Sequence, residues 1–220
     1  MKARLLVFAL LAAAMPSLAF SQKVEINPYA GFYWPSNTLA FGSFQSSQLL
    51  GVRGGYYVTS GFEVGANYSW SNHFQPDSSA PGPSQAGALG FPQGTVRANI
   101  WELELSYNFG KRHIFRPAVR PYLTAGAGGL TTNVKDPDAF VLNVKPVTVP
   151  GTTLYVTNTV LSSSETFFTF SYGGGIKAER LWGPMGFFGD IRGRTIPNFF
   201  GSTLDWPELS AGLTFSWGER

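Results

Sequence analysis

The chain has 220 residues, a length that suits a single domain. Only 13% of the residues are charged, against about 25% in an ordinary soluble domain, whereas 15% are aromatic and 26 residues are glycine. Cysteine is absent, which excludes disulfides, thiolate nucleophiles and thiolate metal sites.

Residues 1–21 have the pattern of a secretory signal peptide. Lys2 and Arg4 precede a short apolar run, and small residues at its end predict cleavage before Gln22, or alternatively after Ala19. The run is too short for a transmembrane helix, which needs about 20 residues. Removing this segment lowers the formal net charge from +3 to +1. The charge therefore gives no support for nucleic-acid binding, and we expect export by the Sec pathway.

The remaining residues, 22–220, form one predicted domain in which apolar and polar residues alternate. The clearest stretch is 100–109, where Trp101, Leu103 and Tyr107 share one parity and carboxylates occupy the other. A period of two is that of a β-strand, and aromatic residues at both ends of an apolar face are typical of a strand that crosses a bilayer. The expected strands are 24–34, 48–58, 62–70, 100–109, 119–130, 166–179, 185–194 and 208–217.

The connections between these strands are expected to alternate in length. The long ones are 35–47, 71–94, 131–165 and 195–207, and the short ones are 59–61, 110–118 and 180–184. The longest, 131–165, is rich in valine, which predicts a hairpin extending past the membrane. Eight strands with this loop asymmetry predict an all-β fold, an antiparallel up-and-down transmembrane β-barrel with long loops outside and both termini in the periplasm.

A soluble secreted barrel with an apolar interior, such as a lipocalin, would show the same alternation. Three features favour the membrane barrel: the aromatic ends of the apolar stripes, the small residues on the polar faces, and the location of almost all strand charges on those polar faces. An eight-stranded barrel is just wide enough for its side chains to fill. We therefore expect a plugged lumen with an ion-pair network, formed by Arg53, Glu63, Glu102, Glu104, Arg120, Lys177, Glu179, Asp190, Arg192 and Arg194, together with Glu25 and Glu208.

Several short stretches carry a resemblance to a known family. They are Arg120-Pro121-Tyr122 running into TAGAGG, YGGGIKAE at 172–179, and the closing SAGLTFSWG. With these stretches the chain resembles the OmpA-like family of eight-stranded outer-membrane barrels, without that family's peptidoglycan-binding domain. The resemblance implies that Phe215 and Trp217 act as the signal read by the barrel assembly machinery, although here the chain continues for three residues beyond Trp217.

Other candidate sites have simpler interpretations. The glycine runs at 126–129 and 173–175 match neither a dinucleotide fingerprint nor a P-loop. His73 and His113 are expected at opposite ends of the barrel, which excludes a shared metal site. Glu102 and Glu104 resemble an acid–base pair, but basic residues on the same faces favour structural ion pairs. We therefore expect no catalytic, metal or cofactor site and no enzyme.

The sequence predicts a monomeric protein of the Gram-negative outer membrane, in contact with its lipid. Its predicted role is structural, adhesive or surface-binding through the long loops, with an unknown external ligand. Three alternatives remain: a narrow, porin-like channel for small solutes, a lipid-modifying enzyme, and a soluble lipocalin-like carrier.

Overall fold

The computed structural model describes residues 23–35, 44–74, 96–109, 118–134, 147–149, 152–154, 164–199 and 202–218. The predicted signal peptide and most of the expected loops lie outside these ranges. No helix in them is long and apolar enough to cross a membrane. The strands are β1 (Val24–Tyr33), β2 (Ser47–Tyr57), β3 (Phe62–Ser71), β4 (Val96–Asn108), β5 (Ala118–Val134), β6 (Val147–Val149), β7 (Thr152–Leu154), β8 (Ser164–Trp182), β9 (Met185–Phe199) and β10 (Ser202–Trp217).

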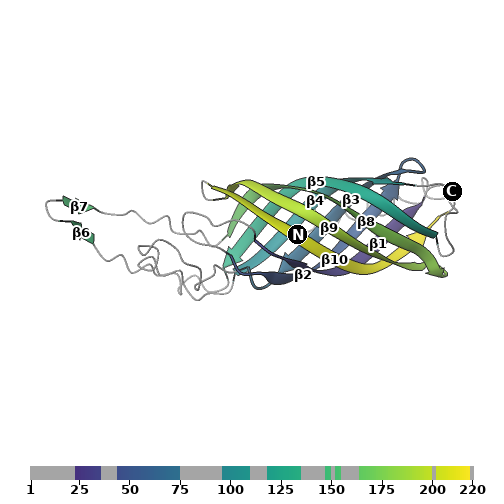
Figure 1. Ribbon diagram of the computed structural model, residues 1–220, viewed down its shortest axis with the longest axis horizontal. Helices are drawn as coiled ribbons and strands as arrows, with labels where there is room; N and C mark the ends of the chain where they lie inside the picture. Colours follow the sequence, from purple (N-terminus) through teal and green to yellow (C-terminus); the bar gives the residue numbers. More distant parts are fainter. Residues whose placement is uncertain are drawn as a thin grey trace, which may run out of the picture.

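Eight of these strands close into one antiparallel barrel, which confirms the predicted fold (Figure 1). Going around the barrel, the order is β1-β10-β9-β8-β5-β4-β3-β2. Each barrel strand therefore pairs with the barrel strands before and after it in the chain, and β1 closes on β10. All adjacent pairs are antiparallel. Closure leaves the barrel wall without a free edge at mid-height, which is the condition for a β-structure to cross a membrane.

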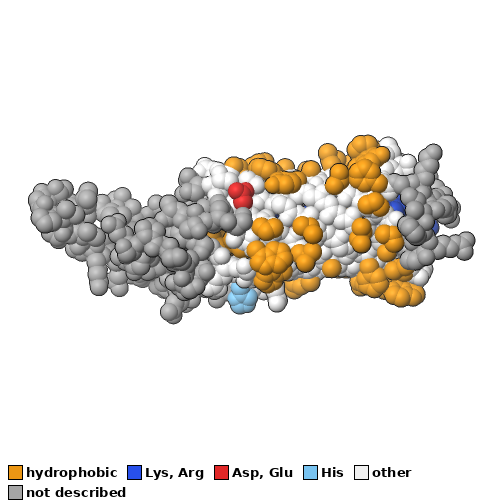
Figure 2. Space-filling view, viewed as in Figure 1, with side chains coloured by type: hydrophobic (Ala, Val, Ile, Leu, Met, Phe, Trp, Pro, Cys, Tyr) orange, Lys and Arg blue, Asp and Glu red, His pale blue; other side chains and the backbone are white. Residues whose placement is uncertain are grey.

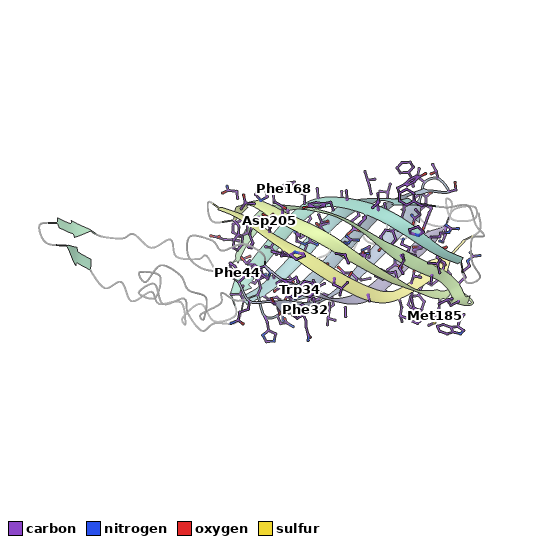
Figure 3. All side chains as sticks on the ribbon, in the orientation of Figure 1. Phe32, Trp34, Phe44, Phe168, Met185 and Asp205 are labelled. Atoms are coloured by element: carbon purple, nitrogen blue, oxygen red, sulfur yellow. The ribbon has the colours of Figure 1, made fainter. Side chains whose placement is uncertain are left out.

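The two ends of the barrel differ. We call the end where β1 begins and β10 ends the terminal end, and the opposite end the loop end. Figure 3 shows Met185 at the terminal end and Phe44, Phe168 and Asp205 at the loop end. The strands differ in length, since β1 and β3 have 10 residues whereas β5 has 17 and β8 has 19.

The prediction of a loop at 195–207 is wrong. Strand β9 continues to Phe199 and β10 begins at Ser202, with Ile196 opposite Leu204 in the register. Prolines and polar residues in this segment hide its alternation, but Ile196 and Leu204 are fully buried in the barrel. The last connection is therefore short, and the expected strict alternation of long and short connections fails there.

Within the expected connection 131–165, β6 and β7 form a short antiparallel hairpin in which Val147 pairs with Leu154. The hairpin suggested by the valine-rich sequence is therefore present. Its position relative to the membrane stays a prediction.

Along most of the barrel, apolar side chains point outward and polar side chains point inward. Figure 2 shows hydrophobic side chains gathered towards both ends of the visible outer face, with backbone and uncharged polar side chains prominent between them. Strand β4 illustrates the pattern: Leu103 is 71% exposed, whereas Glu102 and Glu104 are buried. The apolar exterior and charged interior fit a barrel surrounded by lipid.

Near the loop end the same strands reverse this arrangement. On β4, Val96, Ala98 and Ile100 are buried inside the barrel, while Arg97 and Asn99 lie on the outer parity. From Trp101 onward the apolar residues of β4 face outward. On β10, Leu204 and Trp206 are inside, and Glu208 is the next inward residue. The loop end is therefore built like a soluble barrel, with apolar groups inside.

Candidate functional site

The candidate site is the barrel interior, and it has two layers. The ion-pair layer fills the terminal and middle parts of the lumen. It contains all ten residues named for the lumen by the sequence pattern, plus Lys23, Glu25 and Glu208; Arg120 is half-buried and the others are buried. The mouth cluster fills the loop end and consists of Tyr33, Leu49, Phe74, Val96, Ala98, Ile100, Leu130, Ile196, Phe199, Leu204 and Trp206, with Phe44 and Phe167 packed against it.

At the terminal end, two lysines bridge carboxylates from different strands. Lys177 Nζ on β8 lies 2.7 Å from Glu63 on β3 and 3.0 Å from Glu25 on β1. Lys23 Nζ lies 2.5 Å from Glu25 and 2.6 Å from Glu179. These bridges cross the lumen, because β3 and β8 are not neighbours in the barrel wall.

A tyrosine joins these charges into one layer. The Tyr57 hydroxyl lies 3.0 Å from Glu25, to which it donates, and 3.4 Å from Glu179. The Lys23 ammonium lies 4.3 Å from the centre of the Tyr57 ring. Arg120 adds a longer contact of 3.8 Å to Glu179. The side chains leave little of the terminal half of the lumen to solvent.

In the middle of the barrel, two arginines and two carboxylates from three strands, β2, β4 and β9, meet. Arg192 Nη1 lies 2.5 Å from Glu104, and Arg53 Nη1 lies 2.9 Å from Asp190. Arg53 also approaches Glu104 at 3.3 Å, and Arg192 approaches Asp190 at 3.1 Å. The Tyr122 hydroxyl donates to Asp190 at 2.7 Å. Each buried charge therefore has an opposite charge beside it, as the high cost of an isolated buried ion requires.

The upper edge of the ion-pair layer is held by Arg194. Its guanidinium lies 2.5 Å from Glu102 and 3.3 Å from Glu208. Its central carbon lies 6.0 Å from the ring of Trp206, the first aromatic residue above it. Arg194 thus marks the boundary between the ion-pair layer and the mouth cluster.

Glycines make room for the large interior side chains. A Cβ at Gly51 would lie 2.5 Å from the ring of Tyr29, and one at Gly175 would lie 2.6 Å from the Cβ of Asp190. Side-chain atoms do not approach this closely, so both positions require glycine. The glycine run at 173–175 therefore lies inside strand β8 and serves packing.

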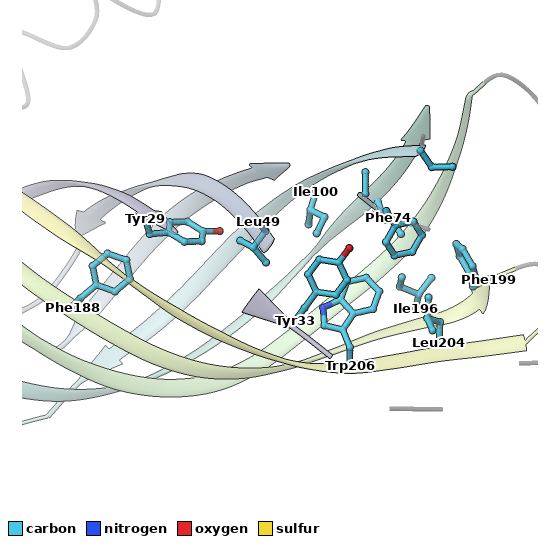
Figure 4. Packing of buried hydrophobic residues seen from close by; sticks show 13 residues of the cluster. Tyr29, Tyr33, Leu49, Phe74, Ile100, Phe188, Ile196, Phe199, Leu204 and Trp206 are labelled. Carbon is cyan, nitrogen blue, oxygen red and sulfur yellow. The ribbon is translucent and has the colours of Figure 1, made fainter. Parts of the chain in front are cut away.

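The mouth cluster is dominated by aromatic rings (Figure 4). Phe44 stacks on Phe74 with ring centres 4.6 Å apart, and Phe74 contacts Phe199 and Trp206 at 6.0 Å. Tyr33 lies 5.4 Å from Trp206, and its hydroxyl is 3.3 Å from the Ser71 hydroxyl. Tyr29 and Phe188 lie deeper, and both rings face the Arg53 guanidinium, at 4.9 Å and 5.1 Å.

Sequence reasoning missed Lys23 and the whole mouth cluster. Lys23 lies two residues before Glu25 and therefore on the same face, but it precedes the first apolar residue of the expected strand. Extending the alternation by one residue was the only signal that could have identified it. The mouth cluster was missed because an inward polar face was expected along the entire length of every strand. The shift of apolar residues from one parity to the other at Ile100 and Trp101 was the available signal.

The described ranges contain no group of three or more residues suited to hold a metal ion. His73 follows β3 and its backbone nitrogen donates to Ser71 at 3.4 Å, whereas His113 lies outside the described residues. Glu102 and Glu104 both contact arginines, so they do not form an isolated carboxylate pair. The glycine run at 126–129 lies within β5 and opens no helix.

The family model of the outer membrane protein beta-barrel domain matches residues 5–199. The chain belongs to this family. It is therefore a bacterial outer-membrane barrel, as the OmpA-like resemblance implied, and the soluble carrier alternative is excluded.

The chain is also similar to solved structures. Neisserial surface protein A aligns over 88% of this chain and 96% of its own, at 15% identity and a TM-score of 0.53. The N-terminal β-barrel domain of Pseudomonas aeruginosa OprF aligns over 89% and 98%, at 16% identity and a TM-score of 0.42. No curated protein matches the chain. At this identity the likeness to the Neisserial protein shows a shared fold.

Proposed function

We propose that this outer-membrane barrel is a non-conducting, non-enzymatic anchor that displays its long loops at the cell surface for adhesion or envelope contacts. The observation that carries the proposal is the filled interior. Ion pairs cross the lumen at three levels, from Lys23 to Arg194, and aromatic rings fill the loop end. A solute that crossed the barrel would have to displace the side chains of the mouth cluster and also break the ion-pair layer.

The extended strands support a display role. Strands β5 and β8 stay paired as far as Asn133 and Ser164, beyond the level at which β4 turns from an apolar to a polar exterior. The pair is joined laterally by a 2.9 Å contact between the hydroxyls of Thr131 and Thr166. It forms a rigid base for the longest connection, which includes the β6–β7 hairpin.

The orientation belongs to the same proposal. We place the loop end outside the cell and both termini in the periplasm, because the polar exterior and long connections occur at the loop end. Residues 1–21 direct Sec export, residues 22–220 form the mature barrel, and the stacked Phe215 and Trp217 rings at the end of β10 are recognised during assembly. The proposal includes a monomeric state, which the closed wall supports because it leaves no strand edge at mid-height for a second copy to pair with.

The test compares the full chain with a variant in which residues 136–162 are replaced by a short Asn-Gly turn. Resistance of the unboiled barrel to SDS should be unchanged, because its ladder has no free edge to attack. Adhesion of expressing cells to protein-, polysaccharide- and hydrocarbon-coated surfaces should fall to the level of non-expressing cells. An equally adhesive loop variant would overturn the role of this loop. Stepwise conductance of the intact protein in planar bilayers would instead favour the channel alternative.

A further inference from the structure

We propose that the outer face of the barrel binds one phosphate-bearing membrane lipid, with an acyl chain in a groove across β9, β10 and β1 and the phosphate beside Arg97. This lipid stays in place, in contrast to the exchanging lipids that surround the rest of the wall. Because the site lies on the wall, it is independent of the loop-borne role proposed above.

The first observation is a groove of about 790 Å³ in the lipid-facing surface. Its floor consists of Gly189, Ala211 and Ala30, which carry no side chain or a single methyl group. They are direct neighbours in the register, because Ala211 pairs with Gly189 on one side and with Ala30 on the other. The floor is therefore continuous across three strands, and the volume lies within the range of about 300–1,000 Å³ that is usual for ligand pockets.

Bulky apolar side chains surround this floor. On its loop side, Ile191, Leu209 and Phe32 form the next row of outward residues, and Ile191 is 64% exposed. Ile176 and Leu50 stand at the two ends of the floor. An acyl chain on the floor contacts these side chains along its length. Such packing is what holds apolar partners together inside a bilayer, because lipid tails are themselves apolar and supply no hydrophobic driving force.

The second observation is the direction of the groove. From Ala30 the row of the floor continues through Leu50 and Trp70 to Asn99, which lies beyond the level at which β4 leaves the lipid. Four strand spacings separate Asn99 from Ala211, about 19 Å along the wall. With strands tilted by about 40°, the row descends by about 12 Å over this distance. Half of the hydrocarbon core is about 15 Å thick, so the groove spans one leaflet, as an acyl chain does.

The third observation concerns the polar groups where the groove meets the loop end. Among the outward-facing residues that line the groove, only Gln48 is polar. It pairs with Phe32, which Figure 3 shows in the loop-end half of the barrel. Leu50 and Gln48 both line this end of the groove, so the acyl chain leaves between them.

A cation lies close to this exit. Asn72 directly follows β3, and the exposed Arg97 lies beside it on β4. Arg97 Nε donates to Asn72 Oδ1 at 3.0 Å, which holds the guanidinium on the outer surface. A guanidinium has five N–H donors in a planar fork that matches phosphate oxygens, and this bond uses one of them. A lipid with an anionic phosphate therefore complements the loop-side end of the groove.

The occupant is a lipid rather than a second copy of the chain. In a symmetric dimer the same surface meets itself, and two facing grooves enclose a space that no side chain fills. An acyl chain is narrow enough for the floor. It also belongs to the medium that already covers this face of the barrel.

The test is native mass spectrometry of the full mature chain in non-ionic micelles, titrated with phosphatidylglycerol. One adduct of 1:1 stoichiometry should form well before any further ones. Diacylglycerol with the same chains lacks the phosphate and should bind about fivefold more weakly, as expected for the loss of one arginine–phosphate contact. Glycerol 3-phosphate has no acyl chain and should give no adduct at the same concentration.

Two variants locate the two parts of the lipid. Arg97→Gln should lower the affinity for phosphatidylglycerol about fivefold and leave that for diacylglycerol unchanged. Ala211→Leu fills the floor and should weaken binding of both lipids about fivefold, because several van der Waals contacts with the chain are lost. Matched controls are Arg180→Gln, an exposed arginine at the terminal end, and Ala125→Leu on the outer face of β5. Neither control should change binding, and all four variants should keep their resistance to SDS.

Three outcomes would overturn the proposal. Several adducts of equal affinity, unchanged in every variant, would mean that lipids cover the wall without a specific site. Equal losses in Ala211→Leu and Ala125→Leu would remove the groove as the binding site. A glycerol 3-phosphate adduct that disappears in Arg97→Gln would show a site for a soluble anion instead of a lipid.

Discussion

The interior of this barrel contains two regions built on opposite principles. In the ion-pair layer, charged residues lie inside and apolar residues face outward, whereas around the mouth cluster apolar residues lie inside and polar ones face outward. Both arrangements occur on the same strands and are separated by one or two residues, as at Ile100 and Trp101 of β4. The reason is the surrounding medium. Polar side chains face away from lipid, and apolar side chains face away from water. The level at which the apolar residues change from the inner to the outer face of the strands marks where the barrel leaves the lipid.

The largest loss of stability is expected when one charge of the ion-pair layer is removed. Arg194→Met leaves Glu102 and Glu208 buried without their cation, and removing one partner of a buried pair costs about 3–5 kcal/mol. The urea midpoint for unfolding in micelles should fall accordingly. Adding Glu102→Gln to this variant should recover part of the loss. Equal stability of Arg194→Met and the parent would mean that the carboxylates are hydrated.

The second test places a charge on the outer face of β4 on either side of the boundary. Leu103→Arg inserts a cation where lipid is expected and should destabilise the barrel in bilayers by about 2–4 kcal/mol. Asn99→Arg, on the same face of the same strand but beyond the boundary, should change stability little. Similar losses at both positions would place the lipid boundary elsewhere.

A smaller, more local effect is expected in the mouth cluster. Leu204 is 0% exposed and Leu209, on the outer parity of the same strand, is 48% exposed. Leu204→Ala leaves a cavity and should cost about 2–3 kcal/mol, seen first as faster hydrogen exchange where β9 and β10 pair around Ile196 and Leu204. In Leu209→Ala, lipid fills the space, so the loss should be much smaller. Slower or unchanged exchange at this level of β9 and β10 in Leu204→Ala would contradict this assignment.

The smallest effect is expected in conductance. Opening the mouth with Phe74→Ala and Trp206→Ala should leave the protein non-conducting in planar bilayers, because the ion pairs from Lys23 to Arg194 still cross the lumen. Channel steps in this double variant would show that the mouth cluster alone seals the barrel.

The sequence by itself determined the membrane barrel, its eight strands and the inward face on which every predicted charge lies. These follow from the alternation of apolar and polar residues along each strand. It could not determine which cation meets which carboxylate. Lys177 and Glu63 are 114 residues apart and lie on strands that are not neighbours, so only barrel closure brings them together.

The mouth cluster also depended on tertiary structure. Ile196, Leu204 and Trp206 stand among prolines and polar residues, and their local pattern is that of a loop. They become a core only because Phe44, Phe74 and Phe167 arrive from other parts of the chain. Alternation reveals which residues share a face, whereas the medium on each side of that face is decided by where the closed barrel meets lipid and water.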